Sequence, residues 1–209
     1  ENRVLASFGL EALRRSGRPG IRALCRAASI DDGPADAWDV AFKLAPRLNA
    51  AGRLGSARRA VDLLLTANAA AAEQIAEELD RENTRRQKMQ ERMIEEAQAM
   101  IEQSGGLEGR LGLVLASESW HPGVVGVVAG RIADLTCRPT VVIAIDGEEG
   151  QGSARSAGGV NLHDTLSACS DLLIGFGGHA FAAGLRVASS RIGKLAERFE
   201  QHLRTQVTA

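Results

Sequence analysis

The spacing of apolar and polar residues divides the chain into a helical first part and a second part in which strands and helices alternate. Residues 69–104 contain no glycine or proline and are rich in Ala, Glu, Gln, Arg and Met. They predict one long helix of about 50 Å, at roughly 1.5 Å per residue. Its apolar positions follow helical spacing: Ile75, Leu79, Met93, Ala97 and Ile101. Asn83 and Arg86 interrupt this stripe, which favours a helix that bridges two lobes over one with a coiled-coil partner.

Shorter helices are predicted before this long helix. Residues 2–15 and 20–28 have helical patterns on either side of the turn signal SGRPG, and DDGPADAWDV is a loop that leads into a helix from about Asp36. The stretch LNAAGRLGS (48–56) then breaks the periodicity. Ser56 is a plausible N-cap for a further helix that runs to about Thr66.

From residue 107 the pattern predicts an α/β fold with a sheet flanked by helices. Strands are expected at 111–117, 139–145 and 151–156, and helices at 123–135, about 161–170 and about 190–205. Glycines 123, 126 and 130 would let the first of these helices pack closely on the sheet. The expected domains are a mostly helical body (1–66), the long helix (67–104) and an α/β domain (105–209).

The glycine-rich stretch GFGGHAFAAG (175–184) follows the apolar run LLIGF and is expected to form a loop. Its G-x-G-x-x-A spacing fits a dinucleotide fingerprint, but no acidic residue ends a second strand about 20 residues later, which disfavours NAD. Gly177 and Gly178 at a helix N-terminus would expose N–H groups to an anion, and His179 could add a donor. A tight turn between a strand and a helix is the alternative.

Two short motifs also pair residues that could bind phosphate. In GSARS, Ser153 and Arg155 are two residues apart and would share one face of a strand. In NAAGR, Asn49 and Arg53 are four apart, the spacing of one helical turn. The ordinary alternatives are an exposed arginine for GSARS and a helix cap or a surface pair for NAAGR.

Charge and composition restrict what such sites can do. The net charge is −1, but residues 1–60 hold eleven basic and six acidic side chains. Arginine supplies 22 of the 25 basic residues, which suits bidentate phosphate contacts and can equally reflect genome composition. Aromatic residues make up only 3% of the chain, so phosphate contacts rather than base stacking should dominate any binding of nucleic acid.

The remaining signals are mostly negative. Cys25, Cys137 and Cys169 lie far apart in no metal-binding spacing, which favours a reduced, cytoplasmic protein. The four histidines show no metal-ligand spacing, and no apolar run is long enough to cross a membrane. The chain starts at Glu1 rather than Met, so we expect a piece of a longer protein. No self-contained catalytic constellation is visible.

Taken together, the motifs resemble those of a known family. Six blocks occur in order: APRLNAAGRLGSARRAVDLLL (45–65), LDRENTRRQ (79–87), SESWHPGVVGVVAGRIAD (117–134), RPTVVIA (138–144), GSARS and GFGGHAFAAG. This series is similar to the RecJ branch of the DHH phosphoesterase superfamily, whose members are single-strand-specific DNA exonucleases. The GGH and AAG elements resemble the DHH-associated C-terminal domain, and the resemblance covers nearly the whole chain.

The resemblance implies a two-lobed 5′-to-3′ exonuclease of recombination and repair. Its N-terminal DHH lobe would hold two divalent ions, Mn²⁺ or Mg²⁺, that activate water. No Asp-His-His motif occurs here, so this chain is expected to lack those ions, to pair with that missing lobe and to be inactive alone. Residues 1–66 would be the tail of the DHH lobe.

The resemblance also implies roles for particular residues. Those expected to bind single-stranded DNA, with its 5′ phosphate, are Asn49, Arg53, Ser153, Arg155, Gly177, Gly178 and His179. His179 is the best candidate for a residue near the reacting nucleotide, and Asn83 and Arg86 would face the same cleft unless they are simply solvated. The alternative function is a non-catalytic nucleic-acid-binding module like those of alanyl-tRNA synthetases.

Overall fold

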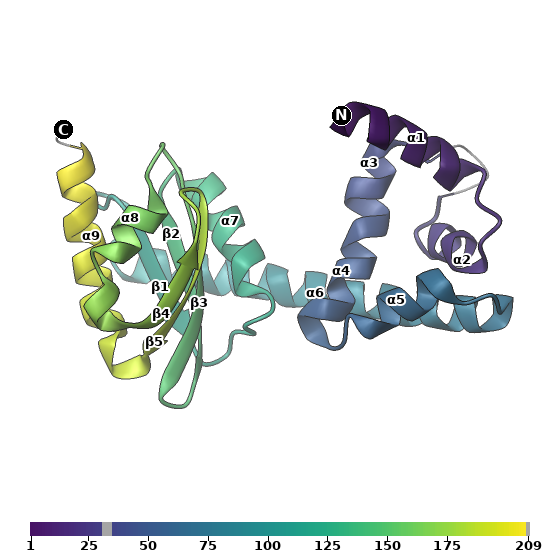
Figure 1. The fold of residues 1–209 in the computed structure, drawn as a ribbon. Coiled ribbons are helices and arrows are strands. Elements are labelled where there is room, and N and C mark those ends of the chain that lie inside the picture. The colour runs from purple at the N-terminus through teal and green to yellow at the C-terminus, as the bar shows by residue number, and fades with distance from the viewer. Residues whose placement is uncertain (31–34, 208–209) are drawn as a thin grey trace. The chain divides into compact units, whose positions relative to one another are not determined.

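The computed structural model describes residues 1–30 and 35–207. Its contacts divide the chain into two compact units, Glu1–Lys88 and Met89–Ala209, and the boundary falls inside the long helix. Figure 1 labels the elements of both units. Residues 31–34, in the loop predicted before Asp36, lie outside the described residues.

The first unit is helical, as predicted. Its elements are α1 (Asn2–Arg14), α2 (Pro19–Ala27), α3 (Ala37–Asp39), a π-helical turn (Val40–Leu44), α4 (Ala45–Leu54), α5 (Arg58–Leu65) and the first part of α6 (Ala69–Gln103). Small and aliphatic side chains form its core, among them Ala23, Leu24, Leu63, Ala76 and Leu79. Gly20 is essential to this packing, because a Cβ there would overlap the backbone oxygen of Leu63.

The predicted interruption at 48–56 is wrong for most of its length. Residues up to Leu54 continue as α4, which follows the π-helical turn without a break. The widened turn lies directly before Pro46, which has no N–H to donate to the preceding turn. Ser56 does accept a hydrogen bond from the backbone N–H of Arg58 at 3.3 Å. Asn49 and Arg53 therefore lie on one continuous helix.

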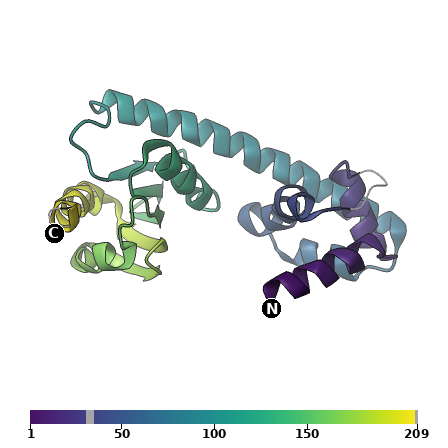
Figure 2. The ribbon, with the colours of Figure 1, turned by 90° about the horizontal axis from the view of Figure 1, so that it is seen from above.

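The long helix is confirmed as α6, which can be followed without a break in Figure 2. The side chain of Asn68 accepts a hydrogen bond from the N–H of Ala71 at its start. At its end, Gly105 has a φ of 93° and the N–H of Gly106 donates to the carbonyl of Ile101. The helix contains no glycine or proline that would break it, and it is bounded by the polar Asn68 at its start and by Gly105 and Gly106 after its end.

The second unit contains a five-stranded mixed sheet. Its strands are β1 (Leu113–Ser117), β2 (Thr140–Asp146), β3 (Glu149–Arg155), β4 (Leu173–Gly178) and β5 (Ala182–Ala188), in the order β1-β2-β3-β5-β4. β1 and β2 are parallel and the other neighbours are antiparallel. The helices are α7 (Val125–Thr136), α8 (Leu162–Ser167) and α9 (Ile192–Val207). The predicted α/β class with a mixed sheet is confirmed.

The helices cover the two faces of this sheet differently. α7 packs on one face against β2 and β3, whereas α8 and α9 lie on the other face (Figure 1). The core beneath α8 and α9 is continuous and includes Val141, Leu166, Leu185, Leu195 and Phe199. On the α7 face, glycines of β4 and β5 are exposed. This partly open face brings the predicted site residues of the second unit together.

Candidate functional site

Ser153 and Arg155 are joined on the α7 face of β3. Nη1 of Arg155 donates to the hydroxyl oxygen of Ser153 at 2.7 Å and to the carbonyl of Ala154 at 2.8 Å. Both side chains are partly buried, whereas Ala154 between them is fully buried against α9's side of the sheet. The prediction that Ser153 and Arg155 share a strand face is confirmed.

Glycines of α7 make room for these two side chains. A Cβ at Gly126 would lie 3.0 Å from Nη2 of Arg155 and 3.2 Å from the hydroxyl oxygen of Ser153. A Cβ at Gly130 would lie 3.9 Å from Cγ of Arg155, an ordinary contact. The predicted close packing of this helix on the sheet is thus realised over the arginine, whose side chain runs beneath α7.

A row of glycines continues this face beyond Ser153. Ser153 is opposite Gly184 on β5, and Gly184 is opposite Gly177 on β4. Residues directly opposite one another in antiparallel strands lie on the same face of the sheet. Gly177 and Gly184 are exposed, and a Cβ at Gly177 would meet no atom within 4 Å. A hydroxyl and a guanidinium therefore border a bare strip of backbone, where a phosphate chain can approach closely.

The predicted loop at 175–184 is wrong in its geometry, because the stretch forms a β-hairpin. β4 ends at Gly178, β5 begins at Ala182, and the N–H of His179 donates to the carbonyl of Ala182 at 2.8 Å. The period-two burial of β5, with Ala183, Leu185 and Val187 inside, explains the second strand.

Because a strand follows the glycines, the expected cradle of N–H groups at a helix N-terminus does not form. The fingerprint for a dinucleotide fails for the same reason, since it needs a helix after the turn. Gly178 has a structural role: its φ is 144°, and a Cβ there would lie 2.4 Å from the carbonyl oxygen of Ala182. His179 lies exposed at the tip of the hairpin.

The first unit holds a second group of predicted residues. Asn49 and Arg53 are exposed on α4, one turn apart. On α6, Asn83 is only 3% exposed, so solvation does not explain it, and its side-chain oxygen accepts a hydrogen bond from Nη2 of Arg86 at 3.1 Å. Burial lowers the pKa of Arg86, and the nearby positive charge of Arg53 lowers this pKa further. The two arginines thus add positive charge to the same part of the first unit, which suits an anion.

An acidic side chain close to this arginine pair is already engaged elsewhere. The carboxylate of Glu82 accepts a hydrogen bond from Nη1 of Arg59 on α5 at 2.7 Å. A Cβ at Gly55 would lie 3.8 Å from the same carboxylate. Sequence reasoning missed this ion pair, because Glu82 and Arg59 are far apart in the chain and neither stands in a recognisable motif.

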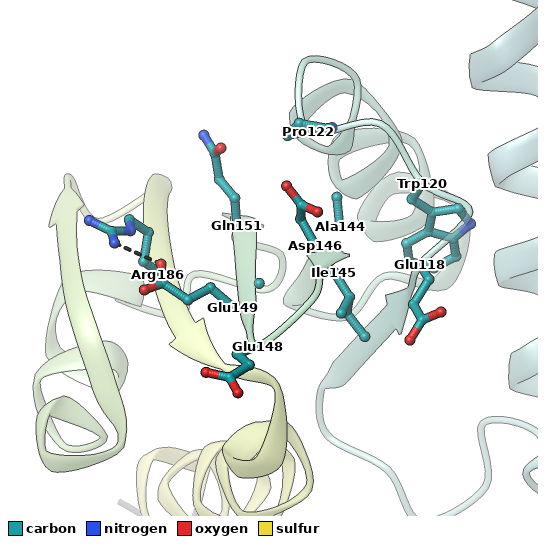
Figure 3. Close-up of a pocket in the computed structure, with 11 residues that line it drawn as sticks. Glu118, Trp120, Pro122, Ala144, Ile145, Asp146, Glu148, Glu149, Gln151 and Arg186 are labelled. Carbon is teal, nitrogen blue, oxygen red and sulfur yellow. Dashed lines mark hydrogen bonds and ion pairs between the residues drawn. The ribbon is translucent and has the colours of Figure 1, made fainter.

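A hollow in the second unit is acidic (Figure 3). It measures about 620 Å³ and contains four carboxylates, from Glu118, Asp146, Glu148 and Glu149. Its one basic side chain, Arg186, pairs with Glu149 at 2.7 Å. This charge repels phosphate, so the hollow is distinct in chemistry from the Ser153–Arg155 face. The sequence analysis did not foresee it.

No metal site is formed by the described residues themselves. Within residues 1–30 and 35–207, no three His, Cys, Asp or Glu side chains are grouped so that they could hold a metal ion. Among these same residues, no helix is both long and apolar enough to cross a membrane.

Comparisons with known proteins relate both units to one group. Residues 110–205 match the DHHA1 domain. The single-stranded-DNA-specific exonuclease RecJ of Bacillus subtilis is 44% identical over 203 residues, which are 96% of this chain and 26% of that protein. RecJ of Thermus thermophilus is 36% identical over 201 residues, 96% of this chain and 28% of that protein. The chain thus spans about a quarter of the length of these curated relatives.

Solved structures give the same result. The crystal structure of Thermus thermophilus RecJ in complex with Mg²⁺ has a TM-score of 0.87 at 36% identity, over 98% of this chain and 31% of that one. A crystal structure of exonuclease RecJ bound to manganese has a TM-score of 0.82 at 35% identity, over 97% of this chain and 50% of that one.

Proposed function

Residues 110–205 are a DHHA1 domain, and nearly the whole chain is homologous to RecJ exonucleases. On this premise we propose that the chain binds the substrate of a 5′-to-3′ single-stranded-DNA exonuclease. The reaction is hydrolysis of phosphodiester bonds, in recombination and repair. The observation that carries the proposal is the Ser153–Arg155 pair beside the exposed glycines of β4 and β5.

In this proposal Arg155 binds the 5′ phosphate. A guanidinium presents several donors in one plane, which matches phosphate oxygens, and a hydroxyl adds a donor at short range. Nη1 of Arg155 is directed to Ser153, and α7 confines the rest of the side chain. This confinement reduces the conformational freedom lost on binding. The strip at Gly177 and Gly184 leaves space for the sugar-phosphate chain.

Asn49, Arg53 and Arg86 supply further phosphate contacts in this proposal. The positive charge of Arg53 disfavours the charged form of Arg86 in the unbound protein, and a bound phosphate would offset this repulsion. The pKa of Arg86 is lowered first by burial and then by the charge of Arg53, and a bound anion would favour its charged form. Asn83 positions the guanidinium of Arg86 through its buried side chain. His179, exposed beyond Gly178, is the candidate for contact with the reacting nucleotide.

The chemical step needs groups that the described residues do not provide. The described residues do not form a metal site, whereas related RecJ structures are in complex with Mg²⁺ or bound to manganese. We therefore propose that a DHH lobe outside this chain holds the ions, which would supply an activated water molecule. Residues 1–66 would be the tail of that lobe and residues 105–209 the DHH-associated domain, joined by residues 67–104.

Exposed apolar side chains in the first unit support the existence of such a partner lobe. Val4, Leu5 and Phe8 on α1 are largely exposed, as are Trp38 and Phe42. Several large apolar side chains exposed in one unit are typical of a protein body that another one covers. The three cysteines are free, which agrees with the proposed cytoplasmic location. The alternative of a synthetase module is not favoured, because RecJ matches extend over both units.

The test is a fluorescence-anisotropy titration of the 209-residue chain with one short DNA strand, with and without a 5′ phosphate, at low salt. Arg155→Ala should weaken binding of the phosphorylated strand by about 1.5–3 kcal/mol, the range for a hydrogen bond to a charged group. Binding of the 5′-hydroxyl strand should change far less. Arg186→Ala is the matched control, because Arg186 lies in the acidic hollow. An equal loss for both strands would contradict the 5′-phosphate role.

A further inference from the structure

Phe181 presents an aromatic ring to solvent at the tip of the β4–β5 hairpin. Its side chain is 74% exposed, the largest value for any big apolar side chain among the described residues. Exposure to this degree costs free energy, because an aromatic ring removes a large apolar area from water when it is buried. The other aromatic rings of the second unit do not share this exposure: Trp120 and Phe199 are buried and Phe176 is partly buried.

The exposure of Phe181 does not come from a loosely held turn. The carbonyl of Phe181 accepts a hydrogen bond from the N–H of Ser156 at 3.0 Å, and the carbonyl of Ala180 accepts one from Leu162 at 2.9 Å. The N–H of His179 closes the hairpin by donating to Ala182 at 2.8 Å. The backbone on both sides of the ring is therefore fixed, and a partner that contacts the ring has little backbone entropy to overcome.

The position of Phe181 in the sheet connects it to the phosphate site. Ala182, the next residue, is directly opposite Arg155, and Phe181 itself is bonded to Ser156, the residue after Arg155. The backbone of Phe181 thus lies one position beyond the Arg155–Ala182 pair, at the same end of the sheet as Arg155. In a nucleic acid the base is attached to the same sugar as its phosphate, so a strand held by Arg155 brings bases to this region.

We propose that Phe181 is a base-stacking residue, which contacts the face of a nucleobase in the strand whose phosphate Arg155 binds. This inference rests on the proposed function and adds to it a contact with the base. Stacking is tolerant of sequence, because every base has a π-face. The chain therefore combines phosphate contacts with one stacking contact, rather than the extended aromatic platform for which it has too few aromatic residues.

The experiment compares two single strands of equal length with a 5′ phosphate, one with normal bases and one in which abasic deoxyribose units replace the first nucleotides. Phe181→Ala should raise the Kd for the normal strand by about five- to a hundred-fold, from the range measured for one base–aromatic stack. It should leave the Kd for the abasic strand unchanged. Phe181→Trp should retain wild-type binding of the normal strand, since a larger ring can still stack.

Phe8→Ala is the matched control, because Phe8 is 68% exposed but lies on α1 of the first unit. It should not change either Kd. The inference is overturned if Phe181→Ala binds the normal strand like the wild type, or if it loses affinity equally for both strands. Arg155→Ala separates the two proposals. If Arg155→Ala weakens binding of the normal strand and Phe181→Ala does not, the phosphate site is retained and stacking is rejected. Absence of wild-type binding to any strand rejects both.

Discussion

Arg86 in the first unit and Arg155 in the second are both fixed arginines, but the protein fixes them by different means. Arg86 is held on a helix by the side chain of Asn83, a buried polar residue, and lies near a second positive charge. Arg155 lies on a strand and donates a hydrogen bond to Ser153. The glycines of α7 leave space for its side chain between the helix and the sheet. The site at Arg86 depends on a buried hydrogen bond. The site at Arg155 depends on the two-residue spacing along β3 and on the close approach of the α7 backbone to that strand.

This difference affects how each site responds to mutation. A buried polar group is costly when its partner is removed, because desolvation has already occurred. A glycine that makes room for a neighbour can be changed with little loss of stability if that neighbour is flexible. We therefore expect changes at Asn83 to alter folding and changes at Gly126 to alter binding.

The largest effect should come from breaking the hairpin that carries the glycine row. Gly178→Ala places a Cβ 2.4 Å from the carbonyl oxygen of Ala182, at a residue whose φ of 144° is unfavourable for any side chain. The second unit should lose about 3 kcal/mol of stability or more. Urea unfolding measures this loss through the emission of the buried Trp120, in a Trp38→Phe background that removes the exposed indole of the first unit.

Gly177→Ala is the control for this change. It lies one residue earlier on the same strand, and its added Cβ would meet no atom within 4 Å. Its midpoint of unfolding should stay close to that of the wild type. Equal destabilisation by both substitutions would mean that strand propensity, rather than the contact at Gly178, limits the hairpin.

These two glycines also illustrate what could be predicted from the sequence. The chemistry of Ser153 and Arg155 was accessible, because a two-residue spacing on a strand fixes a common face. The hairpin was not, because Ala182, Gly184 and neighbouring small residues give β5 little of the apolar contrast that marks a strand. The burial of Asn83 could not be predicted either, since it stands in the polar run RENTRRQ and is covered by tertiary packing.

The next effect in size concerns Asn83. Asn83→Ala removes the acceptor for Nη2 of Arg86 and leaves a half-buried guanidinium with one hydrogen bond fewer. The first unit should be destabilised by about 1–3 kcal/mol. Urea unfolding followed by circular dichroism should show this shift, whereas the Trp120 transition should not move. Thr84→Ala, at the exposed neighbouring position, should change stability by less than about 0.5 kcal/mol.

An unchanged circular dichroism transition in Asn83→Ala would show that the hydrogen bond contributes no net stability. A shift of the Trp120 transition equal to that of the circular dichroism signal would contradict the expectation that only the first unit is destabilised. It would mean that the two units unfold as one, so that a defect on α6 in the first unit reaches the sheet of the second.

The smallest effect should appear at Gly126, where binding rather than folding is altered. In Gly126→Ala the new Cβ lies 3.0 Å from Nη2 of Arg155 and 3.2 Å from the hydroxyl oxygen of Ser153, so these groups must shift by a few tenths of an ångström from the positions that hold the guanidinium. The higher helix propensity of alanine offsets the crowding, and stability should change by less than about 1 kcal/mol. The 5′-phosphorylated strand should bind about two- to fivefold more weakly, a fraction of the full contact.

Gly130→Ala adds only an ordinary contact at 3.9 Å and should bind like the wild type. A loss of binding in both variants would indicate that the position of α7, and not the guanidinium of Arg155, controls the site.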